Sequence, residues 1–530
     1  MNLIKFIGSY VSARLAAVIL AGTVLLIAVL IFSALLHCDG GPDCSIDTDD
    51  SDWRSAHRPR QDDDDDTDDV YPFYPARRTY LPYPFEQFMP QGEYIENFVG
   101  LATEMGTEAE TDWQQEIEID SVTNDLGINK MRVQFAWSSV EPVRNQWDFE
   151  TTDLLADQPV EWIAQLGGAP DWAMPDGSPS EIDPELFADY AYAIADRYCD
   201  TIKQYEIWNE PNNHVFWEPQ PDPEHYFQML KASYASIKMA CPDAEVILGG
   251  LSSTNLPQEI SVGTYEFLGE IGWEHADFCD HFDAVAMHPY TLLDQFPPEW
   301  NDFLGDWDFN SFSLQISAVE VRLGVFGCRE KPIYMTEFGW PDTYLGQDRQ
   351  AAFLLRALLI SVRWGVDGAF WRTFWDMQGR EPQTENDFGL VEYTESPEEI
   401  VQKPAFDALQ FFVEILEGSR FAGVLSEYSI GCDNVGFLDD THQRVTIAAW
   451  NGDSGEPNCT LKIPQPTISS ENSYFDAFGE PITPDLEDDE TIEFTVGGMP
   501  IYLVLEFDSA NGAGFVDSNK RSVIDGDIPF

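Results

Sequence analysis

The sequence of 530 residues predicts an α/β fold: a (β/α)₈ TIM barrel followed by a small antiparallel β-sandwich, with an N-terminal transmembrane helix. Three observations support this prediction. One uncharged apolar segment stands near the N-terminus, a long middle part alternates strand-like and helix-like runs, and the last part contains strand-like runs without helices. A hydrophobic content of 44% supplies material for large cores and excludes a disordered acidic chain.

The apolar segment covers residues 15–36 and is long enough to cross about 30 Å of hydrocarbon as a helix. It exceeds the roughly 7–15 residues of a secretory signal core and ends without a small-residue cleavage site. We therefore expect an uncleaved signal anchor. Lys5 and Arg14 precede the segment and a group of aspartates follows it, so the positive-inside rule places residues 1–14 in the cytoplasm. The C-terminal body is then extracellular, on a single-pass anchor in the cell membrane.

Residues 37–85 form an acidic linker that contains the unbroken aspartate run 62–66. Such a run repels itself and stays extended, and it lacks the spaced ligands and glycine of a calcium loop. The whole chain carries 28 Lys+Arg against 94 Asp+Glu, a formal net charge of −66. Nucleic acid is excluded as a partner, because a phosphate backbone requires a basic footprint. The charge predicts a solvated acidic surface or, more specifically, adaptation to high salt, where screening removes the self-repulsion.

Residues 86–420 carry the barrel pattern. Strand–helix alternation predicts a parallel sheet, and eight such units predict a closed barrel. A doubly wound sheet is disfavoured, because Gly100 stands alone where a glycine-rich phosphate turn would follow the first strand. The expected strands are 94–103, 129–135, 160–166, 204–209, 245–251, 282–287, 332–337 and 367–372, and the expected helices include 184–198, 223–240 and 349–364.

The cysteines are even in number and contain no CxxC pair, which disfavours zinc. Four of them stand shortly before strands four to seven, at the N-terminal end of the expected barrel, where neighbouring strands would bring them together. The alternative is that several are buried free thiols. The expected disulfides are Cys199–Cys241 and Cys279–Cys328 in the barrel, Cys432–Cys459 in the next domain and Cys38–Cys44 in the linker.

Residues 421–508 show short alternating runs separated by turn residues, a pattern that predicts an antiparallel β-sandwich. The polar tail 509–530 is expected to be flexible. The expected sandwich strands are 434–438, 444–450, 460–463, 491–496 and 501–507.

Two glutamates stand at strand ends, where (β/α)₈ barrels carry their chemistry. Glu210 follows strand four in the segment YEIWNEPN, and Glu337 ends strand seven in the segment IYMTEFGWP. Both follow apolar strands and have aromatic neighbours. Desolvation can keep one such carboxyl protonated, while cations or hydroxyl donors keep a partner ionised. These are the two states that glycoside hydrolysis requires.

These two segments resemble the large clan of retaining (β/α)₈ glycoside hydrolases, which carries the acid/base on strand four and the nucleophile on strand seven. The WNEPN segment followed by Phe216 and Trp217 resembles glycoside hydrolase family 39, whereas the TEFGWP segment is similar to family 5 and other cellulase-like members. The family within the clan is therefore left open. The resemblance covers the barrel, and a small β-sandwich after the barrel also fits family 39.

The resemblance implies roles for particular residues. Glu210 would be the acid/base, Glu337 the nucleophile, and Asn209 the partner of the sugar 2-hydroxyl. Arg132 would keep the nucleophile ionised. His288 and Tyr290 after strand six would contact the substrate and the nucleophile, although a purely structural role stays open for each. Trp371 on strand eight would form the floor of the −1 subsite, and five further tryptophans after strands could be sugar platforms or core residues: Trp137, Trp172, Trp217, Trp340 and Trp375.

The sequence therefore predicts a membrane-anchored, extracellular retaining glycoside hydrolase that cleaves β-linked O-glycosidic bonds of a polysaccharide or oligosaccharide by double displacement. Its partner is a carbohydrate substrate. No signal for a metal site, a nucleotide or a flavin is present, and no cofactor is expected. Two alternatives share the same residues: an inactive carbohydrate-binding or adhesive surface protein, and a transglycosylase.

Overall fold

The computed structural model describes residues 92–105, 111–253, 261–291, 296–299, 311–377, 386–424, 429–430, 432–439, 444–452, 458–464, 472–487 and 491–506. All of these belong to one compact unit, Phe73–Phe530. The expected anchor, the acidic linker, the flexible tail and the Cys38–Cys44 pair lie outside the described residues. Within the described ranges, no helix combines the length and the apolar character that crossing a membrane requires.

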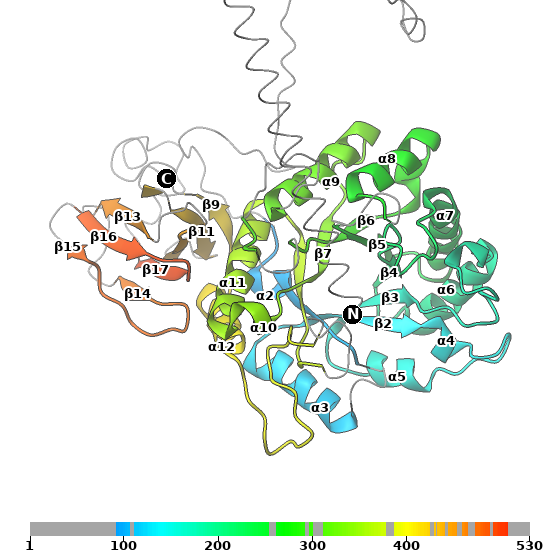
Figure 1. Cartoon of the computed structure of the whole chain (residues 1–530), viewed down its shortest axis with the longest axis horizontal. Helices are drawn as coiled ribbons and strands as arrows, with labels where there is room; N and C mark the ends of the chain where they lie inside the picture. Colours follow the sequence, from blue (N-terminus) through cyan, green and yellow to red (C-terminus); the bar gives the residue numbers. More distant parts are fainter. Residues whose placement is uncertain are drawn as a thin grey trace, which may run out of the picture. The chain divides into compact units, whose positions relative to one another are not determined.

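Eight parallel strands close into a barrel in the order β1-β2-β3-β4-β5-β6-β7-β8, and β1 pairs with β8 to complete it (Figure 1). The predicted barrel is confirmed. The inside of the barrel contains an apolar cluster that includes Ile163, Ile247 and Phe370, separate from the main core outside the strands. The strands are β1 (Val99–Ala102), β2 (Lys130–Ala136), β3 (Glu161–Gly167), β4 (Gln204–Asn209), β5 (Glu245–Ser252), β6 (Ala284–His288), β7 (Ile333–Phe338) and β8 (Gly368–Arg372).

The helices form the outer layer of the barrel. The starts of α6 and α7 are set by aspartate caps: the Asp183 side chain accepts from Glu185 N, the Asp222 side chain accepts from His225 N, and proline follows each cap. The described helices are α2 (Ile95–Phe98), α3 (Asp112–Asp120), α4 (Trp137–Val140), α5 (Glu150–Ala156), α6 (Pro184–Tyr198), α7 (Pro223–Ala240), α8 (Thr264–Glu274), α9 (Phe312–Phe326), α10 (Asp342–Leu345), α11 (Gln347–Arg363) and α12 (Pro404–Leu416).

The first strand differs from its expected range of 94–103. Residues Ile95–Phe98 form the single helical turn α2, and β1 begins only at Val99. A short apolar run fits a buried helical turn and a buried strand equally well, because periodicity cannot separate the two over four residues. The other seven strands start and end within two residues of their expected positions.

Three of the four expected disulfides are present. Cys199–Cys241 and Cys279–Cys328 join the ends of helices that precede neighbouring barrel strands, with Cα–Cα distances of 5.4 and 5.8 Å. Cys432–Cys459 joins two segments of the sandwich, with a Cα–Cα distance of 5.3 Å. The barrel bridges therefore stand at the end of the barrel opposite the strand ends that carry Glu210 and Glu337.

The C-terminal part is a sandwich of two antiparallel sheets, of order β10-β13-β16-β15 and β14-β17-β12-β11-β9. Its core receives Leu438 and Ile447 from one sheet and Leu461 and Phe494 from the other. The five expected strands are present, and four shorter ones were not predicted. The strands are β9 (Ser419–Gly423), β10 (Ser429–Ile430), β11 (Asp433–Asp439), β12 (Arg444–Trp450), β13 (Cys459–Pro464), β14 (Ser473–Phe475), β15 (Leu486–Glu487), β16 (Thr491–Val496) and β17 (Ile501–Glu506).

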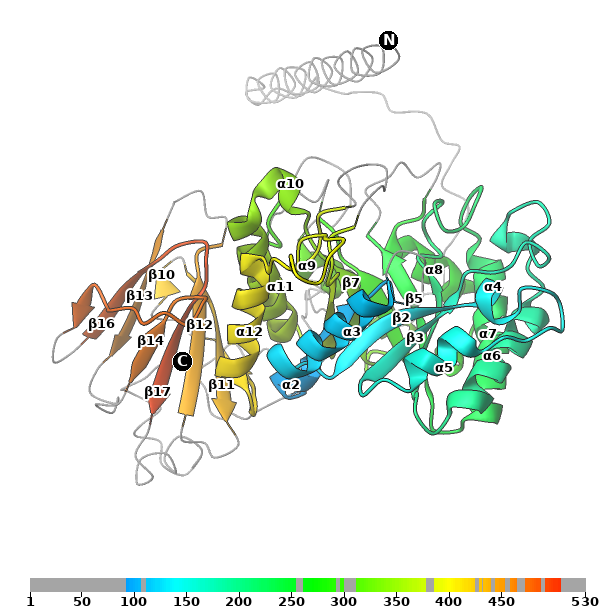
Figure 2. The same cartoon turned by 90° about the horizontal axis from the view of Figure 1, so that it is seen from below.

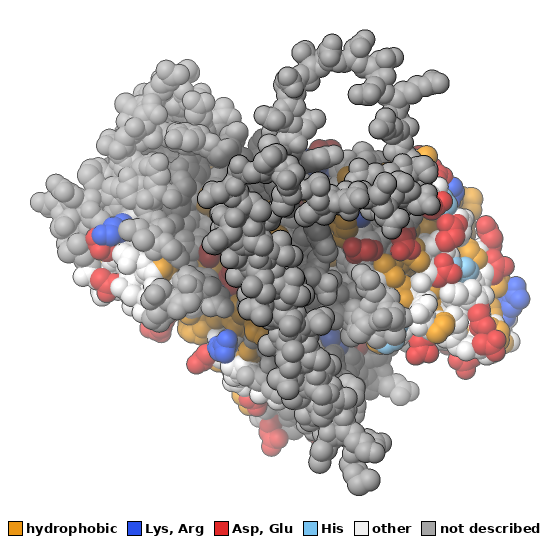
Figure 3. All heavy atoms as spheres, turned by 45° about the horizontal axis from the view of Figure 1, so that its top comes forward, with side chains coloured by type: hydrophobic (Ala, Val, Ile, Leu, Met, Phe, Trp, Pro, Cys, Tyr) orange, Lys and Arg blue, Asp and Glu red, His pale blue; other side chains and the backbone are white. Residues whose placement is uncertain are grey.

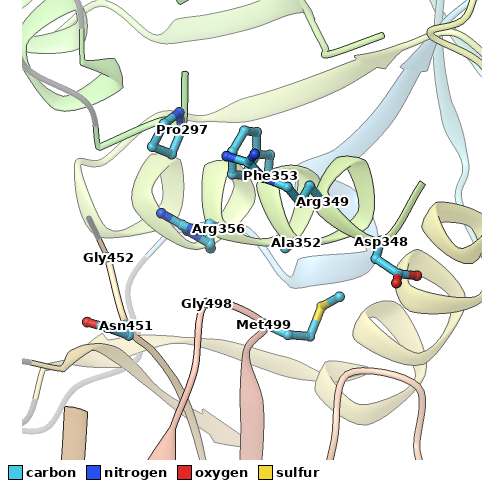
Figure 4. Close-up of a pocket in the computed structure, with 10 residues that line it drawn as sticks. All are labelled: Pro297, Asp348, Arg349, Ala352, Phe353, Arg356, Asn451, Gly452, Gly498 and Met499. Carbon is cyan, nitrogen blue, oxygen red and sulfur yellow. The ribbon is translucent and has the colours of Figure 1, made fainter. Parts of the chain in front are cut away.

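Helices α11 and α12 stand between the barrel strands and the sandwich (Figures 1 and 2). Arg356 of α11 and Trp450 of β12 both donate to Glu299 Oε1, at 2.9 and 2.7 Å. A cavity of about 360 Å³ opens beside this contact, between α11 and the loops that carry Asn451 and Met499 (Figure 4). Neither Glu210 nor Glu337 lines it, so this cavity is separate from the strand-end glutamates.

Acidic side chains are spread over the described surface visible in Figure 3, with few basic side chains between them. Their distribution on this face follows the excess of 94 Asp+Glu over 28 Lys+Arg in the sequence. Adaptation to high salt remains a prediction, because an acidic surface is also compatible with ordinary solvation.

Candidate active site

Glu210 and Glu337 meet at the C-terminal end of the barrel. Glu210 directly follows β4 and is 6% exposed, and Glu337 lies near the end of β7. One carboxylate oxygen of each and one ring nitrogen of His288, from the end of β6, all lie within 4.8 Å of one another. Residues more than 120 positions apart in the chain therefore form one compact group because strands four, six and seven of a parallel barrel end on the same side.

The turn that presents Glu210 has an uncommon backbone. Trp208 and Glu210 both adopt positive φ, of 69° and 44°, a conformation that side chains with a Cβ rarely take and that clusters at functional sites. The turn is fastened to β5: Glu210 N donates to Gly250 O at 3.0 Å. Asn212 donates its side-chain amide to Ser252 O at 2.8 Å and accepts from Ser252 N at 2.9 Å. These bonds explain how the strained turn is maintained.

Glu210 contacts an amide and an imidazole. Asn213 Nδ2 donates to Glu210 Oε2 at 2.8 Å, and His288 Nδ1 lies 2.9 Å from Glu210 Oε1. His288 is fully buried, and its other ring nitrogen lies 3.2 Å from Thr336 Oγ1. The imidazole is therefore fixed from both sides and holds the Glu210 carboxyl in one orientation.

Glu337 stands among donors and cations. Tyr290 donates its hydroxyl to Glu337 Oε1 at 2.6 Å, and Arg132 Nη1 donates to Glu337 Oε2 at 3.3 Å. Arg372 Nε lies 3.7 Å from Glu337 Oε1. Burial alone raises the pKa of Glu337, but the charges of Arg372, His288 and Arg132 and the Tyr290 hydrogen bond outweigh it and lower the pKa to about 2. Glu337 is therefore ionised at neutral pH.

Arg132 connects Glu337 to two residues of β4. Its Nη2 and Nε donate to the two oxygens of Glu206 at 2.7 and 3.0 Å, and Nη2 also donates to Asn209 Oδ1 at 2.8 Å. Glu206 is fully buried and also accepts from Gly250 N at 3.1 Å. Because Asn209 Oδ1 is occupied by Arg132, the Asn209 amide nitrogen is directed away from the guanidinium.

The structure brings together Arg132, Asn209, Glu210, His288, Tyr290 and Glu337, as the sequence predicted. Sequence reasoning missed Glu206, Arg372, Thr336 and Asn213. A signal was present for Glu206, because a carboxylate inside the otherwise apolar strand YEIW requires a buried cation as partner. Arg372 adjoins Trp371, on which the prediction concentrated instead.

Five of the six predicted tryptophan contacts need correction. These side chains are at most 2% exposed, and each indole N–H is bonded within the protein, so none offers an open ring face to a sugar. The acceptors are Glu141 for Trp137, Ser180 for Trp217, Thr291 for Trp340, Phe388 for Trp371 and Gln114 for Trp375.

Trp371 shows the physical reason most clearly. Successive residues of a strand face opposite sides, and Phe370 belongs to the apolar cluster inside the barrel. Trp371 therefore faces outward and packs against Phe338 at 5.5 Å between ring centroids. Its neighbour Arg372 takes the inward position beside Glu337. Trp172 is the one predicted platform that keeps partial exposure, and its indole donates to Glu141 O at 2.9 Å.

The group Glu210, His288 and Glu337 has the donor types and spacing that could hold a metal ion. Two arginines nevertheless stand beside Glu337, at 3.3 and 3.7 Å. Their charges oppose a second cation at that carboxylate. The donor set therefore fits a catalytic carboxylate pair better than a metal centre.

No protein-family model and no curated protein matches the chain. Solved structures do. A family 39 glycoside hydrolase from Bacteroides cellulosilyticus WH2 is similar with a TM-score of 0.62 and 21% identity, over 78% of this chain and 82% of that one. A monomeric β-xylosidase from Caulobacter crescentus CB15 is similar with a TM-score of 0.56 and 15% identity, over 80% of this chain and 98% of that one.

A family 30 endoxylanase from Clostridium papyrosolvens C71 is also similar, with a TM-score of 0.51 and 12% identity, over 79% of this chain and 98% of that one. These shares exceed the barrel alone, so the likeness extends into the sandwich. The chain therefore has the (β/α)₈ barrel and β-sandwich fold of family 39 glycoside hydrolases, as the WNEPN segment suggested. At these identities the likeness establishes the fold.

Proposed function

We propose that the chain is a retaining glycoside hydrolase that cleaves β-linked O-glycosidic bonds. One observation carries the proposal: two strand-end carboxylates with oxygens within 4.8 Å of one another have opposite surroundings. Retaining enzymes hold their two carboxyl groups about 5–5.5 Å apart, whereas inverting enzymes leave about 6.5–9.5 Å for a water molecule. The short separation of Glu210 and Glu337 supports the retaining mechanism.

The different surroundings of Glu210 and Glu337 suit them to different roles. Glu337 is held ionised by Arg132, Arg372 and Tyr290, which suits a nucleophile. Glu210 contacts the Asn213 amide and the His288 imidazole, which suits a group that alternates between the acid and its conjugate base. The fold likeness to a family 39 glycoside hydrolase supports the same assignment.

In the first step, a Glu337 oxygen attacks the anomeric carbon while Glu210 gives its proton to the departing glycosidic oxygen. The C–O bond to the leaving group breaks, and a glycosyl ester of Glu337 forms. In the second step, Glu210 as carboxylate removes a proton from water, whose oxygen attacks the anomeric carbon. The ester bond breaks, the sugar leaves with its original anomeric configuration, and both glutamates return to their first state.

Asn209 is positioned to assist both steps. Because its Oδ1 accepts from Arg132, its Nδ2 is free to donate to the sugar 2-hydroxyl. Hydrogen bonds to this hydroxyl strengthen in the transition state and contribute several kcal/mol in such enzymes. The substrate remains a β-linked polysaccharide or oligosaccharide. Two proteins of similar fold are named as a β-xylosidase and an endoxylanase, which is a reason to test β-xylosides first.

The test compares Glu210→Gln and Glu337→Gln with wild type on chromogenic β-xylosides and β-glucosides. We expect wild type to release the chromophore, and each variant to lose at least about 10²–10⁴-fold in kcat. Glu245→Gln is the matched control, since Glu245 is a partly buried carboxylate at the other end of β5, bonded to Gln204. Wild-type inactivity on a broad panel, or equal losses in all three variants, would refute the proposal. Product analysis separates hydrolysis from transglycosylation.

We further propose that the segment 15–36 anchors the enzyme in the cell membrane with its body outside. The three disulfides support this location, because such bonds persist in oxidising compartments and are rare in the cytosol. Extraction of cells with alkaline carbonate should leave the full chain in the membrane pellet. Deletion of residues 1–36 should release it, and a full chain that stays soluble would contradict the anchor.

A further inference from the structure

Two glutamine side chains meet on the inner wall of the barrel, on β2 and β3. Gln134 pairs in register with Gln165, and Gln134 Nε2 donates to Gln165 Oε1 at 2.9 Å. Gln134 stands two residues beyond Arg132, on the same face of β2, so its Cα lies about 6.6 Å closer to the mouth of the barrel. Since Arg132 contacts both Glu337 and Asn209, the carboxamide pair adjoins the catalytic group.

The two glutamines differ in exposure. Gln134 is exposed, although the residues on either side of it, Val133 and Phe135, are buried. Gln165 is 2% exposed, and its Nε2 has no hydrogen-bond partner among the described residues. A buried amide donor without a partner costs about 1–3 kcal/mol, so such a group in a native structure calls for an explanation.

The end of β3 leaves space for the pair. A Cβ on Gly167 would stand 2.5 Å from Gln165 Nε2, and a Cβ on Gly168 would stand 3.3 Å from Gln134 Oε1. Gly168 also has a φ of +61°, which favours glycine. The sequence QLGG thus combines a polar side chain with two residues that keep the wall beside it open.

The wall formed by Gln134 and Gln165 carries no charged side chain of its own. Gln134 retains an acceptor oxygen and one amide hydrogen, a combination that matches a sugar hydroxyl, which both donates and accepts. The nearby arginines are already committed: Arg132 to Glu206, Asn209 and Glu337, and Arg372 to Glu337. Both arginines beside Glu337 therefore already face carboxylates of the protein, which disfavours a further carboxylate on the sugar.

We propose that Gln134, supported by Gln165, is a specificity-determining contact for a hydroxyl of the glycosyl unit transferred to Glu337, and that this unit is a neutral sugar and not a uronic acid. The inference rests on the proposed glycosidase function and narrows its substrate class. Binding places a sugar hydroxyl against the exposed Gln134 amide, which Gln165 holds in place.

The experiment uses the full chain and Gln134→Met, which keeps the length of the side chain and removes its hydrogen bonds. The probes are 4-nitrophenyl β-xyloside, β-glucoside and β-galactoside, their 2-, 3- and 4-deoxy analogues, and 4-nitrophenyl β-glucuronide. We expect kcat/KM on the best neutral glycoside to fall about two- to tenfold, the range for one neutral hydrogen bond. For the deoxy analogue that lacks the contacted hydroxyl, Gln134→Met and wild type should have the same kcat/KM. On the other glycosides the ratio of the two kcat/KM values should not change when 4-methylumbelliferone replaces 4-nitrophenol as leaving group.

The matched control is Gln228→Met, an exposed glutamine on α7 that pairs with Glu224 away from the site. An unchanged kcat/KM in Gln134→Met on every neutral glycoside, a fall that persists on all deoxy analogues, or a wild-type preference for the glucuronide would overturn the inference while the glycosidase function stands. Wild-type inactivity on the entire panel would instead overturn the function on which it rests.

Discussion

Replacing Glu206 by glutamine tests whether a residue that cannot touch the substrate controls the site through Arg132. Glu206 is fully buried and holds Arg132 by a two-point contact of 2.7 and 3.0 Å. Glutamine keeps the shape of the side chain but replaces one acceptor oxygen by an NH₂ group, which faces a guanidinium donor. Arg132 then keeps one acceptor oxygen at position 206 and loses the other, besides its contacts with Asn209 and Glu337, the two groups it must position.

The size of the effect follows from burial. Removing one partner of a buried ion pair costs about 3–5 kcal/mol, because the remaining charge stays uncompensated. Arg132 keeps Glu337, so we expect a loss near the lower limit, about 3 kcal/mol of unfolding free energy. Misplacement of catalytic groups by about 1 Å costs about 10²-fold in rate. Since Asn209 acts mainly in the transition state, kcat should fall by about this factor while KM changes little.

The assay combines urea unfolding with steady-state kinetics, and the surface pair Arg197–Asp153 provides the control. It has the same two-point geometry, at 2.6 Å for both bonds, but its side chains are 43% and 42% exposed. An exposed pair contributes about 0–1 kcal/mol, so Asp153→Asn should change neither stability nor kcat by much. If Glu206→Gln loses no more stability than Asp153→Asn and keeps its kcat, Glu206 is not a positioning residue and the reasoning fails.

Two further predictions concern the nucleophile and the barrel bridges. Tyr290→Phe removes the 2.6 Å hydrogen bond that helps to lower the pKa of Glu337 to about 2, so this pKa should rise by about one to two units. Because Glu337 must be ionised, kcat/KM is lost as pH falls through the pKa of Glu337. The acidic limb of the pH profile of kcat/KM should therefore move to higher pH in the variant. Acidic limbs that coincide in wild type and variant would contradict this. Joint replacement of Cys199 and Cys241 by serine opens a loop of 42 residues and should cost about 4 kcal/mol in urea unfolding. Activity should persist, since the bridge stands at the opposite end of the barrel.

The sequence was most informative where local signals agreed with the fold. The strand β4 and the helices α6 and α7 match their expected ranges residue for residue, because aspartate caps followed by proline mark both helix starts. The sequence could not separate α2 from β1, where an apolar run of few residues carries no period. The short strands β10 and β15 have two residues each and depend on neighbours distant in sequence.

Residue identity predicted the site better than residue orientation. The four residues predicted around the two glutamates, Arg132, Asn209, His288 and Tyr290, came from the resemblance to the clan, and the structure places them beside the glutamates. The prediction for Trp371 failed because a shift of one position reverses the side of a strand that a residue faces. Trp371 and Arg372 are adjacent, yet one packs on Phe338 in the wall and the other reaches Glu337. Motif spacing does not contain that information; the register of β8 on β1 does.

A chain with a net charge of −66 disfavours a further negative charge, yet Glu337 is ionised. The distances over which the charges act explain why both hold. The field of an acidic chain and the burial of the carboxyl both favour the protonated form of Glu337. Charges beyond about 10 Å are largely screened at 0.1 M salt, however, whereas buried contacts are screened much less. The Tyr290 hydroxyl, Arg132 and Arg372 act at 2.6, 3.3 and 3.7 Å, far inside that range. Close contacts, with the charge of His288 among them, therefore decide the state of the nucleophile, and the composition of the remaining surface can follow the solvent in which the protein works.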